Sequence, residues 1–169
     1  LRCDTHAAWY SILMAAHDPL RLREPLDDLN AGEESWQSGG VHYFHYSHYS
    51  NPRRLMAPFV GGFEVSRVWD ARPGVAENFA SIFTKKPLVC VRPEEVSDGV
   101  DLVFLADCNG DGSDHYQLAA PGLKKGVPTF IDKPFAETLR KARRIEALAD
   151  KLQAPVMSIS LLQTSELMT

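Results

Sequence analysis

The order of apolar and polar positions in the second half of the chain predicts alternating strands and helices. The segment Asp101–Ala106 is almost entirely apolar, which is typical of a strand buried on both faces of a parallel sheet. Leu139, Ala142 and Ile145 begin an apolar stripe at a spacing of three to four residues, the pattern of a helix that packs on a sheet. In chain order, the pattern predicts a strand at Asp101–Ala106, a helix capped by Ser113 and ended by Gly126, a strand at Val127–Ile131, a helix from Phe135 to about Leu152 and a strand at Ala154–Ser160.

The first half repeats this order with one interruption. Asp4 or Thr5 is expected to cap a helix that runs to about Ala16, and the next strand is expected only at Phe63–Asp70. Pro73 is expected to open a further helix, which the short strand Leu88–Val91 follows. Alternation of this kind predicts an α/β fold, a doubly wound and mostly parallel sheet of the Rossmann type. We expect residues 1–160 to form one such domain, with an insertion at about 18–60, and residues 161–169 to begin a linker to a further domain.

Composition narrows the classes of protein that fit this pattern. The chain has 169 residues and a net charge of −4, which fits a globular domain with its own core. Its basic residues form no stripe apart from acidic ones, so a nucleic-acid partner is not expected. There is no apolar run of about eighteen residues and no signal-peptide pattern, so we expect a soluble, cytoplasmic protein without a membrane partner. The three cysteines predict no disulfide framework.

The triplet Asp132–Lys133–Pro134 carries the clearest candidate chemistry. It comes directly after the predicted strand Val127–Ile131, so Lys133 lies at the carboxyl end of a strand, where open α/β sheets bind ligands. We expect Pro134 to fix the backbone and to start the following helix. The alternative is a surface lysine that Asp132 neutralises.

The stretch from Val100 to Pro134 resembles the nucleotide-binding domain of the Gfo/Idh/MocA oxidoreductases, the family of glucose-fructose oxidoreductase and inositol dehydrogenase. An apolar strand, a polar turn, His115, a helix, a turn at Gly126 and a second strand lead into Asp132–Lys133–Pro134. The family usually has Glu-Lys-Pro there, and aspartate keeps the carboxylate. The resemblance implies an NAD(P)-dependent oxidoreductase that acts on a sugar or cyclitol-like hydroxyl, with Lys133 as the catalytic residue near the nicotinamide. It also implies that a second, sheet-rich domain outside this chain supplies most of the substrate pocket, that homo-oligomers can form through that domain, and that this piece alone is inactive.

The phosphate-binding loop departs from the expected G-x-G-x-x-G pattern. Cys3, Thr5 and Ala8 occupy the three glycine positions, and Ala8 alone is a usual substitute. Side chains at positions 3 and 5 are expected to crowd a pyrophosphate, although the N–H groups of a helix N-terminus still suit an anion. The alternative is that Asp4 and Thr5 only cap a helix.

Asp70 lies at the end of the second predicted strand, where this fold holds its ribose-binding acid. Such a carboxylate repels a 2′-phosphate, so NAD is favoured over NADP, although Arg72 could offset that preference. Asp70 could also only cap the following helix. The full set of predicted cofactor-binding residues is Cys3, Thr5, His6, Ala8, Asp70, Asp107, Asn109, His115, Asp132 and Pro134, and for His115 we expect a structural role more than a catalytic one.

Three patterns in the sequence resemble metal-binding sites, but we assign no residue to a metal. Asp107–Gly112 has the start of a calcium loop, but Leu118 stands where the bidentate glutamate is required. His42, His45 and His48 lie in a Tyr-rich insertion, for which packing against the sheet edge or against another subunit is the alternative. A zinc site from Cys3, His6, Cys108 and His115 would need strands one and four to be neighbours.

Two classes of function remain open at this point. The first is an oxidoreductase domain, and the second is a non-catalytic binding module that kept the fold but has a degenerate phosphate loop. Fold alone does not decide between them.

Overall fold

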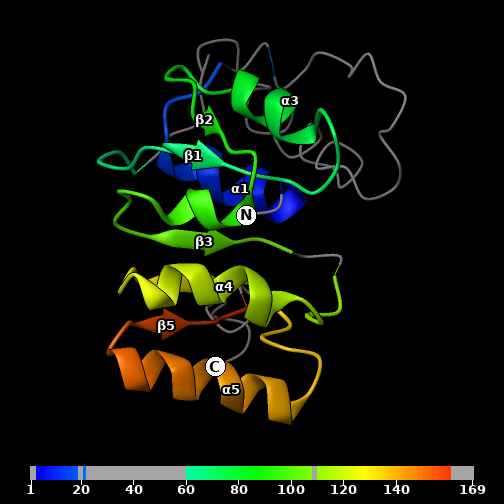
Figure 1. Cartoon of the computed structure of the whole chain (residues 1–169). Helices are drawn as coiled ribbons and strands as arrows, with labels where there is room; N and C mark the ends of the chain where they lie inside the picture. Colours follow the sequence, from blue (N-terminus) through cyan, green and yellow to red (C-terminus); the bar gives the residue numbers. More distant parts are fainter. Residues whose placement is uncertain (1–2, 19–20, 22–59, 108–109, 161–169) are drawn as a thin grey trace, which may run out of the picture. The chain divides into compact units, whose positions relative to one another are not determined.

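The computed structural model describes residues 3–18, 21, 60–107 and 110–160 (Figure 1). The chain divides into two compact units, an N-terminal unit of residues 2–91 and a C-terminal unit of residues 92–169. In the ranges that the model describes, no helix has the length and apolar character needed to cross a membrane.

The described residues of the N-terminal unit form two helices and a two-stranded parallel sheet. Its elements are α1 (Thr5–Met14), β1 (Arg67–Val68), α3 (Val75–Ser81) and β2 (Leu88–Val89). Arg67 pairs with Leu88 and Val68 with Val89. The described core is apolar and includes Ala8, Ile12, Phe79 and Phe83, with the last two rings in edge-to-face contact.

In the C-terminal unit, the residues that the structure describes form a three-stranded parallel sheet, two α-helices and a short 3-10 helix. Its elements are η1 (Pro93–Ser97), β3 (Val103–Leu105), α4 (His115–Lys124), β4 (Thr129–Ile131), α5 (Leu139–Leu152) and β5 (Val156–Met157). The strand order is β3-β4-β5, with every pair parallel.

Alternating side chains give this sheet two different faces. Val103, Leu105, Thr129 and Ile131 are buried, and α4 packs on β3 and β4. Gly122 of α4 makes this close approach possible, since a Cβ there would lie 3.1 Å from Val103 Cγ2 and 3.2 Å from Thr129 Oγ1. The intervening Phe104 and Phe130 are half-buried on the other face and stack with ring centroids 4.8 Å apart.

The predicted fold class is confirmed, but the strands are shorter than the apolar runs suggested. The described strands also form two separate parallel sheets, whereas one continuous sheet was expected. Prolines help to limit the pairing, because Pro87 and Pro155 directly precede Leu88 and Val156 and have no N–H to donate. Pro155 still accepts a hydrogen bond from Thr129 N, at 2.9 Å.

The expected start of α5 was wrong. The helix begins at Leu139, because Thr138 is extended and its side chain accepts a hydrogen bond from Lys141 N, at 3.3 Å. Pro134 therefore does not start this helix but belongs to a turn between β4 and α5.

Two other helix starts also differ from prediction. Asp114 precedes α4 in place of Ser113, and Gly74, with φ of 78°, precedes α3 after Pro73. The 3-10 helix η1 was not predicted. Almost all of the insertion at 18–60, with its three histidines, and all of the segment 161–169 lie outside the described residues.

Candidate functional site

The first turn of α1 is capped by a carboxylate where a phosphate loop was predicted. Asp4 is buried and its Oδ1 accepts a hydrogen bond from Ala7 N, at 2.9 Å. The Asp4 backbone carbonyl accepts from Ala8 N, at 3.1 Å. A negative charge at the positive end of a helix is stabilising, so this part of the sequence favours helix formation. The same charge opposes a phosphate at that position.

The side chains in the first two glycine positions are directed into the protein. Cys3 is buried, and its thiol donates to the carbonyl of Trp69, at 3.8 Å. Burial raises the pKa of the Cys3 thiol well above its ordinary value, so this cysteine stays protonated at neutral pH. Thr5 is also buried, and its hydroxyl oxygen has no hydrogen-bond partner among the described residues. An unsatisfied hydroxyl in the first turn is the one group here that calls for a polar ligand or water.

Asp70 lies directly after Trp69, just beyond β1, and its carboxylate is saturated by donors from the protein. Oδ1 accepts from Arg72 N and Arg72 Nε, at 2.9 and 3.0 Å. Oδ2 accepts from Cys3 N and Arg72 Nη2, at 2.8 and 3.2 Å. A carboxylate has about four lone-pair positions, so this conformation leaves none for a ribose hydroxyl.

Two opposing effects set the ionisation of Asp70. Burial would raise its pKa, but hydrogen bonds from Arg72 and from Cys3 N outweigh it, and the pKa lies below its ordinary value. Asp70 is therefore ionised at neutral pH and holds the start of the described chain against the end of β1. It does not serve only as a helix cap, because its partners lie at Cys3 and Arg72.

The C-terminal unit places Lys133 where the sequence predicted it. Ile131 ends β4, Asp132 is buried, and Lys133 is exposed at the carboxyl end of the strand. Asp132 Oδ1 accepts a hydrogen bond from Lys133 N, at 2.8 Å, so the aspartate fixes the lysine's backbone. The Lys133–Pro134 peptide bond is cis, and Pro134 is exposed.

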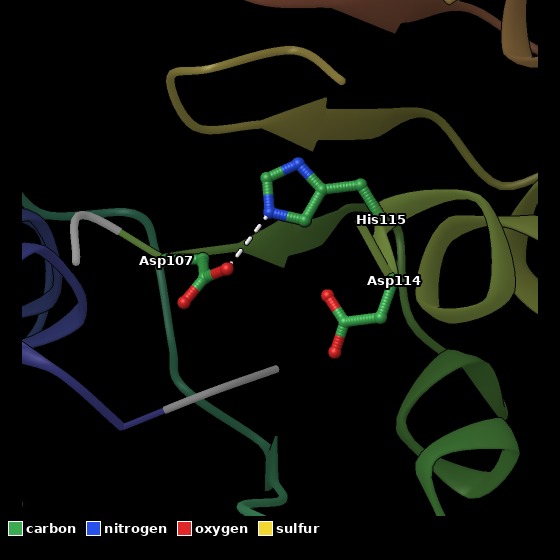
Figure 2. Close-up of side chains that lie close together, drawn as sticks. All are labelled: Asp107, Asp114 and His115. Carbon is green, nitrogen blue, oxygen red and sulfur yellow. Dashed lines mark hydrogen bonds and ion pairs between the residues drawn. The ribbon is translucent and has the colours of Figure 1, made fainter. Parts of the chain in front are cut away.

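His115 and Asp107 form a buried pair across the loop between β3 and α4 (Figure 2). His115 Nε2 lies 3.0 Å from Asp107 Oδ2, and Nδ1 lies 3.4 Å from the carbonyl oxygen of Phe135. The imidazole thus connects the loop after β3 to the turn after β4, two residues from Lys133. This is the structural role that the sequence suggested.

The predicted cofactor-binding residues are therefore only partly brought together. Asp70 meets Cys3, Asp107 meets His115, and Asp132 meets Lys133, while Thr5, His6 and Ala8 share α1, where the His6 ring lies beside Trp9 and Tyr10. Cys108 and Asn109 lie outside the described residues. Both belong to the calcium-like loop Asp107–Gly112, and Cys108 is also one of the four residues of the hypothetical zinc site.

Two features of the site were not recognised from the sequence. Asp114 lies beside Asp107 and His115, and ligand atoms of the three residues lie within 4.8 Å of one another. The signal for this was present, since an aspartate directly precedes the helix-starting histidine. Gly110 is the other, because a Cβ there would lie 1.8 Å from Asp107 Oδ2. Nothing in a single sequence indicates so close an approach.

Parallel strands that alternate with helices place the chain in the α/β class of proteins, which bind ligands at the carboxyl ends of their strands. The chain belongs to the Gfo/Idh/MocA oxidoreductase family, which has an NAD-binding Rossmann fold and whose model matches residues 38–160. The resemblance is thereby confirmed, and an oxidoreductase domain is supported. The matched range includes Asp70, His115 and Lys133 but begins after the capped turn of α1.

Solved structures that match the chain include three proposed oxidoreductases. The one from Klebsiella pneumoniae is 30% identical, with a TM-score of 0.38, over 44% of this chain and 21% of that one. YvaA from Bacillus subtilis is 16% identical, with a TM-score of 0.46, over 57% of this chain and 26% of its own. The one from Bacteroides fragilis NCTC 9343 is 21% identical, with a TM-score of 0.43, over 69% of this chain and 30% of its own.

The chain thus covers less than a third of the length of each of these structures. No curated protein matches it. The family assignment rests on the family match.

Proposed function

We propose that this chain is the dinucleotide-binding part of an NAD(P)-dependent oxidoreductase that acts on a hydroxyl of a sugar or cyclitol-like substrate. The observation that carries the proposal is Lys133, exposed at the carboxyl end of β4 within the range that the family model matches. A second, sheet-rich domain would supply most of the substrate pocket.

Lys133 would act as a fixed cation. When bound, the nicotinamide supplies or accepts the hydride. The Lys133 ammonium would polarise the substrate oxygen or orient the carboxamide, which is electrostatic preorganisation. Asp132 supports this role because its side chain holds the lysine's backbone N–H, at 2.8 Å. His115 is a positioning residue in this proposal, since it braces the turn that carries Lys133 through the Phe135 carbonyl.

A dinucleotide would bind the N-terminal unit in an altered form. Thr5 offers a buried hydroxyl in the first turn of α1, but Asp4 already uses the N–H of Ala7. Beyond β1, the exposed part of Arg72 lies where the ribose acid was predicted, and it neutralises Asp70. We propose that this pair weakens the preference for NAD that Asp70 alone would give, so that NADP is accepted as well.

The remaining expectations belong to the whole protein. We propose a small-molecule substrate, no nucleic-acid or membrane partner, a cytoplasmic location and homo-oligomers formed through the second domain. The net charge of −4 is consistent with the absence of a nucleic-acid partner.

The second candidate function is a binding module that kept the fold without redox chemistry. The cap at Asp4 and the saturated carboxylate of Asp70 favour it, because both use internally the groups that a dinucleotide would need. Such a module would bind a ligand or partner and transfer no hydride.

The test is calorimetric titration of the intact protein with NAD+, NADH, NADP+ and NADPH, followed by turnover assays of Lys133→Ala. For an oxidoreductase we expect cofactor binding in both proteins and a loss of kcat of about 100-fold or more in the variant. Lys124→Ala, which removes an exposed lysine at the end of α4, is the matched control and should keep full turnover. No binding of any of the four cofactors would favour the binding module, and full turnover by Lys133→Ala would remove the role of the lysine.

A further inference from the structure

We propose that Asp107, Asp114 and His115 form a binding site for a divalent transition-metal ion. The three residues belong to the C-terminal unit, and their ligand atoms lie within 4.8 Å of one another. Figure 2 shows the two carboxylates and the imidazole facing a common space between the end of β3 and the start of α4. The site shares His115 with the contact that braces the turn before Lys133. The argument for the metal ion does not rest on the proposed function of Lys133.

The orientation of His115 is the first argument. Both ring nitrogens face hydrogen-bond acceptors, the Phe135 carbonyl at 3.4 Å and the Asp107 carboxylate at 3.0 Å. A neutral imidazole has one N–H, so it can donate to only one of them. In the structure Nε2 and the Asp107 carboxylate share a hydrogen bond. A cation that takes the place of the shared proton would bind both atoms, while Nδ1 donates to the Phe135 carbonyl. Metal-bound histidines are oriented by such a second hydrogen bond to a backbone carbonyl.

The distance between the two atoms agrees with this arrangement. Zinc–nitrogen and zinc–oxygen bonds are about 2.0–2.2 Å long, so two adjacent ligands of one ion lie about 3 Å apart or slightly more. The separation of 3.0 Å between Nε2 and Oδ2 fits two neighbouring ligand positions with little movement of either side chain.

The backbone around Asp107 is the second, independent argument. Gly110 approaches the carboxylate so closely that a Cβ would lie 1.8 Å from Oδ2 and 2.4 Å from Cγ. Gly112 has a φ of +77° and its backbone lies against Ala136, where a Cβ would meet Cα at 3.0 Å. The backbone of Gly110 therefore packs directly on the Asp107 carboxylate, and that of Gly112 packs on the turn after β4.

Charge and burial complete the case. His115 is fully buried and Asp107 almost so, while Asp114 precedes α4 without making a side-chain cap hydrogen bond. Two carboxylates held close together in a site of this kind repel each other, and a divalent ion would neutralise both.

The ligand set indicates which ions to expect. One imidazole and two carboxylates suit Zn²⁺ and Mn²⁺, whereas Mg²⁺ and Ca²⁺ prefer oxygen ligands alone. Mn²⁺ is the more selective probe, because it favours carboxylates over sites built only from histidine or cysteine.

The experiment compares the intact, chelator-treated protein with Asp114→Asn. Zn²⁺ binding is followed by calorimetry and Mn²⁺ binding by electron paramagnetic resonance. We expect one ion of either metal to bind to the native protein and to raise its Tm, because an ion that binds only the folded state stabilises it. Asp114→Asn should weaken both by more than about tenfold, since it removes a charged ligand and nearly keeps the shape of the side chain.

Asp111→Asn is the matched control. Asp111 lies in the same loop, and its Oδ1 accepts a hydrogen bond from Ser113 N. The side-chain oxygen of asparagine can accept the same hydrogen bond. This variant should bind both metals as the native protein does. Absence of Mn²⁺ binding to the native protein, or equal Mn²⁺ affinity in Asp114→Asn, would overturn the proposal. The proposal would also be overturned if His45→Gln abolished Zn²⁺ binding and Asp114→Asn left it unchanged. That result would place the ion on the histidine-rich insertion.

Discussion

At the scale of single residues, the Asp70 carboxylate accepts all its hydrogen bonds from groups of the protein itself. Arg72 and Cys3 supply all four of its hydrogen bonds, and its side chain is fully buried. The position is correct for a ribose-binding acid, but the acceptor sites are occupied. Arg72 is the more exposed residue of the pair, because 30% of its side chain is accessible to solvent.

Arg72→Ala should shift the cofactor preference toward NAD. The substitution removes two side-chain donors from Asp70 and leaves a carboxylate able to accept ribose hydroxyls and to repel a 2′-phosphate. We expect the ratio of NADP to NAD affinity to fall by about tenfold, the size of one charge-assisted hydrogen bond. Titration with both cofactors measures this ratio, with Lys86→Ala as an exposed control. An unchanged ratio would mean that Arg72 does not lie at the 2′ position.

His17 makes a pH-dependent contribution to stability. It is buried, and its Nδ1 lies 3.1 Å from the carbonyl oxygen of Ala15. Burial lowers the pKa of His17, although the contact with that carbonyl opposes the effect. Between the lowered pKa and the ordinary value of about 6.5, the unfolded chain binds a proton that the folded chain does not.

The stabilising effect of His17 is therefore complete above about pH 6.5 and is lost progressively as the pH falls toward the folded-state pKa. In His17→Gln, the free energy of unfolding should vary less with pH across that window. Denaturant unfolding at several pH values measures this, with His6→Gln, on α1, as the control. A pH dependence that is the same in His17→Gln and the native protein contradicts the assignment.

At the scale of elements, α1 begins with an aspartate cap where this fold usually has glycines. Asp4 stabilises the helix through Ala7 N and through the helix dipole, so the local interactions favour folding over anion binding. Thr5 leaves one buried hydroxyl unsatisfied in the same turn. The start of α1 thus has a strong cap at Asp4, while the buried Thr5 hydroxyl has no hydrogen-bond partner among the described residues.

Asp4→Asn separates the cap from its charge. Asparagine caps helices about as well as aspartate, so stability should change by less than about 1 kcal/mol. If a dinucleotide binds with its pyrophosphate at this helix, removing the negative charge should tighten binding by at least about fivefold. Charge repulsion costs about 1 kcal/mol even in water, and Asp4 is buried. Calorimetry on both proteins gives the comparison. Equal affinity would show that no phosphate binds at the start of α1.

The C-terminal unit is more regular, and its turns are held by long-range contacts. Lys141 of α5 donates to the carbonyl of Ser113 at 2.8 Å, and His115 of α4 contacts the carbonyl of Phe135. The loop before α4 and the turn before α5 are therefore fixed against each other. These two contacts position both Lys133 and the proposed metal ligands.

At the scale of the whole molecule, the proposed function assigns most of the substrate pocket to a second domain. It covers 21–30% of the length of the three matching structures described above. Its two units carry different candidate groups, the Asp70–Arg72 pair in the first and Lys133 in the second. The substrate pocket would come mainly from a further domain.

The 169-residue chain alone should bind cofactor but show no turnover. The physical reason is that hydride transfer needs a substrate held in a fixed orientation, and the proposed function assigns most of the residues that would hold it to a second domain. Fluorescence titration with NADPH tests binding, and nicotinamide absorbance with a panel of sugars and cyclitols tests turnover. Turnover by the isolated chain equal to that of the intact protein would refute the need for a second domain.

The sequence by itself determined the fold class, the family and the position of Lys133. Strand and helix patterns depend on the spacing of apolar residues, which can be read directly, as the apolar run of β3 and the buried Ile145 and Ala149 of α5 show. The alternation of buried and half-buried residues in β3 was not predicted, because the run is apolar at every position. The triplet Asp132–Lys133–Pro134 follows an apolar strand, so its place at the strand's carboxyl end needed no coordinates.

Tertiary structure decided what each candidate side chain touches. Strand lengths depended on which residues found partners, and α5 began at Leu139 because Thr138 provided a cap that Phe135 could not. The saturation of Asp70 and the approach of Gly110 to Asp107 arise from contacts between residues whose meeting no local pattern specifies. Local spacing fixes secondary structure, whereas hydrogen bonds and charge clusters depend on how the chain folds back on itself.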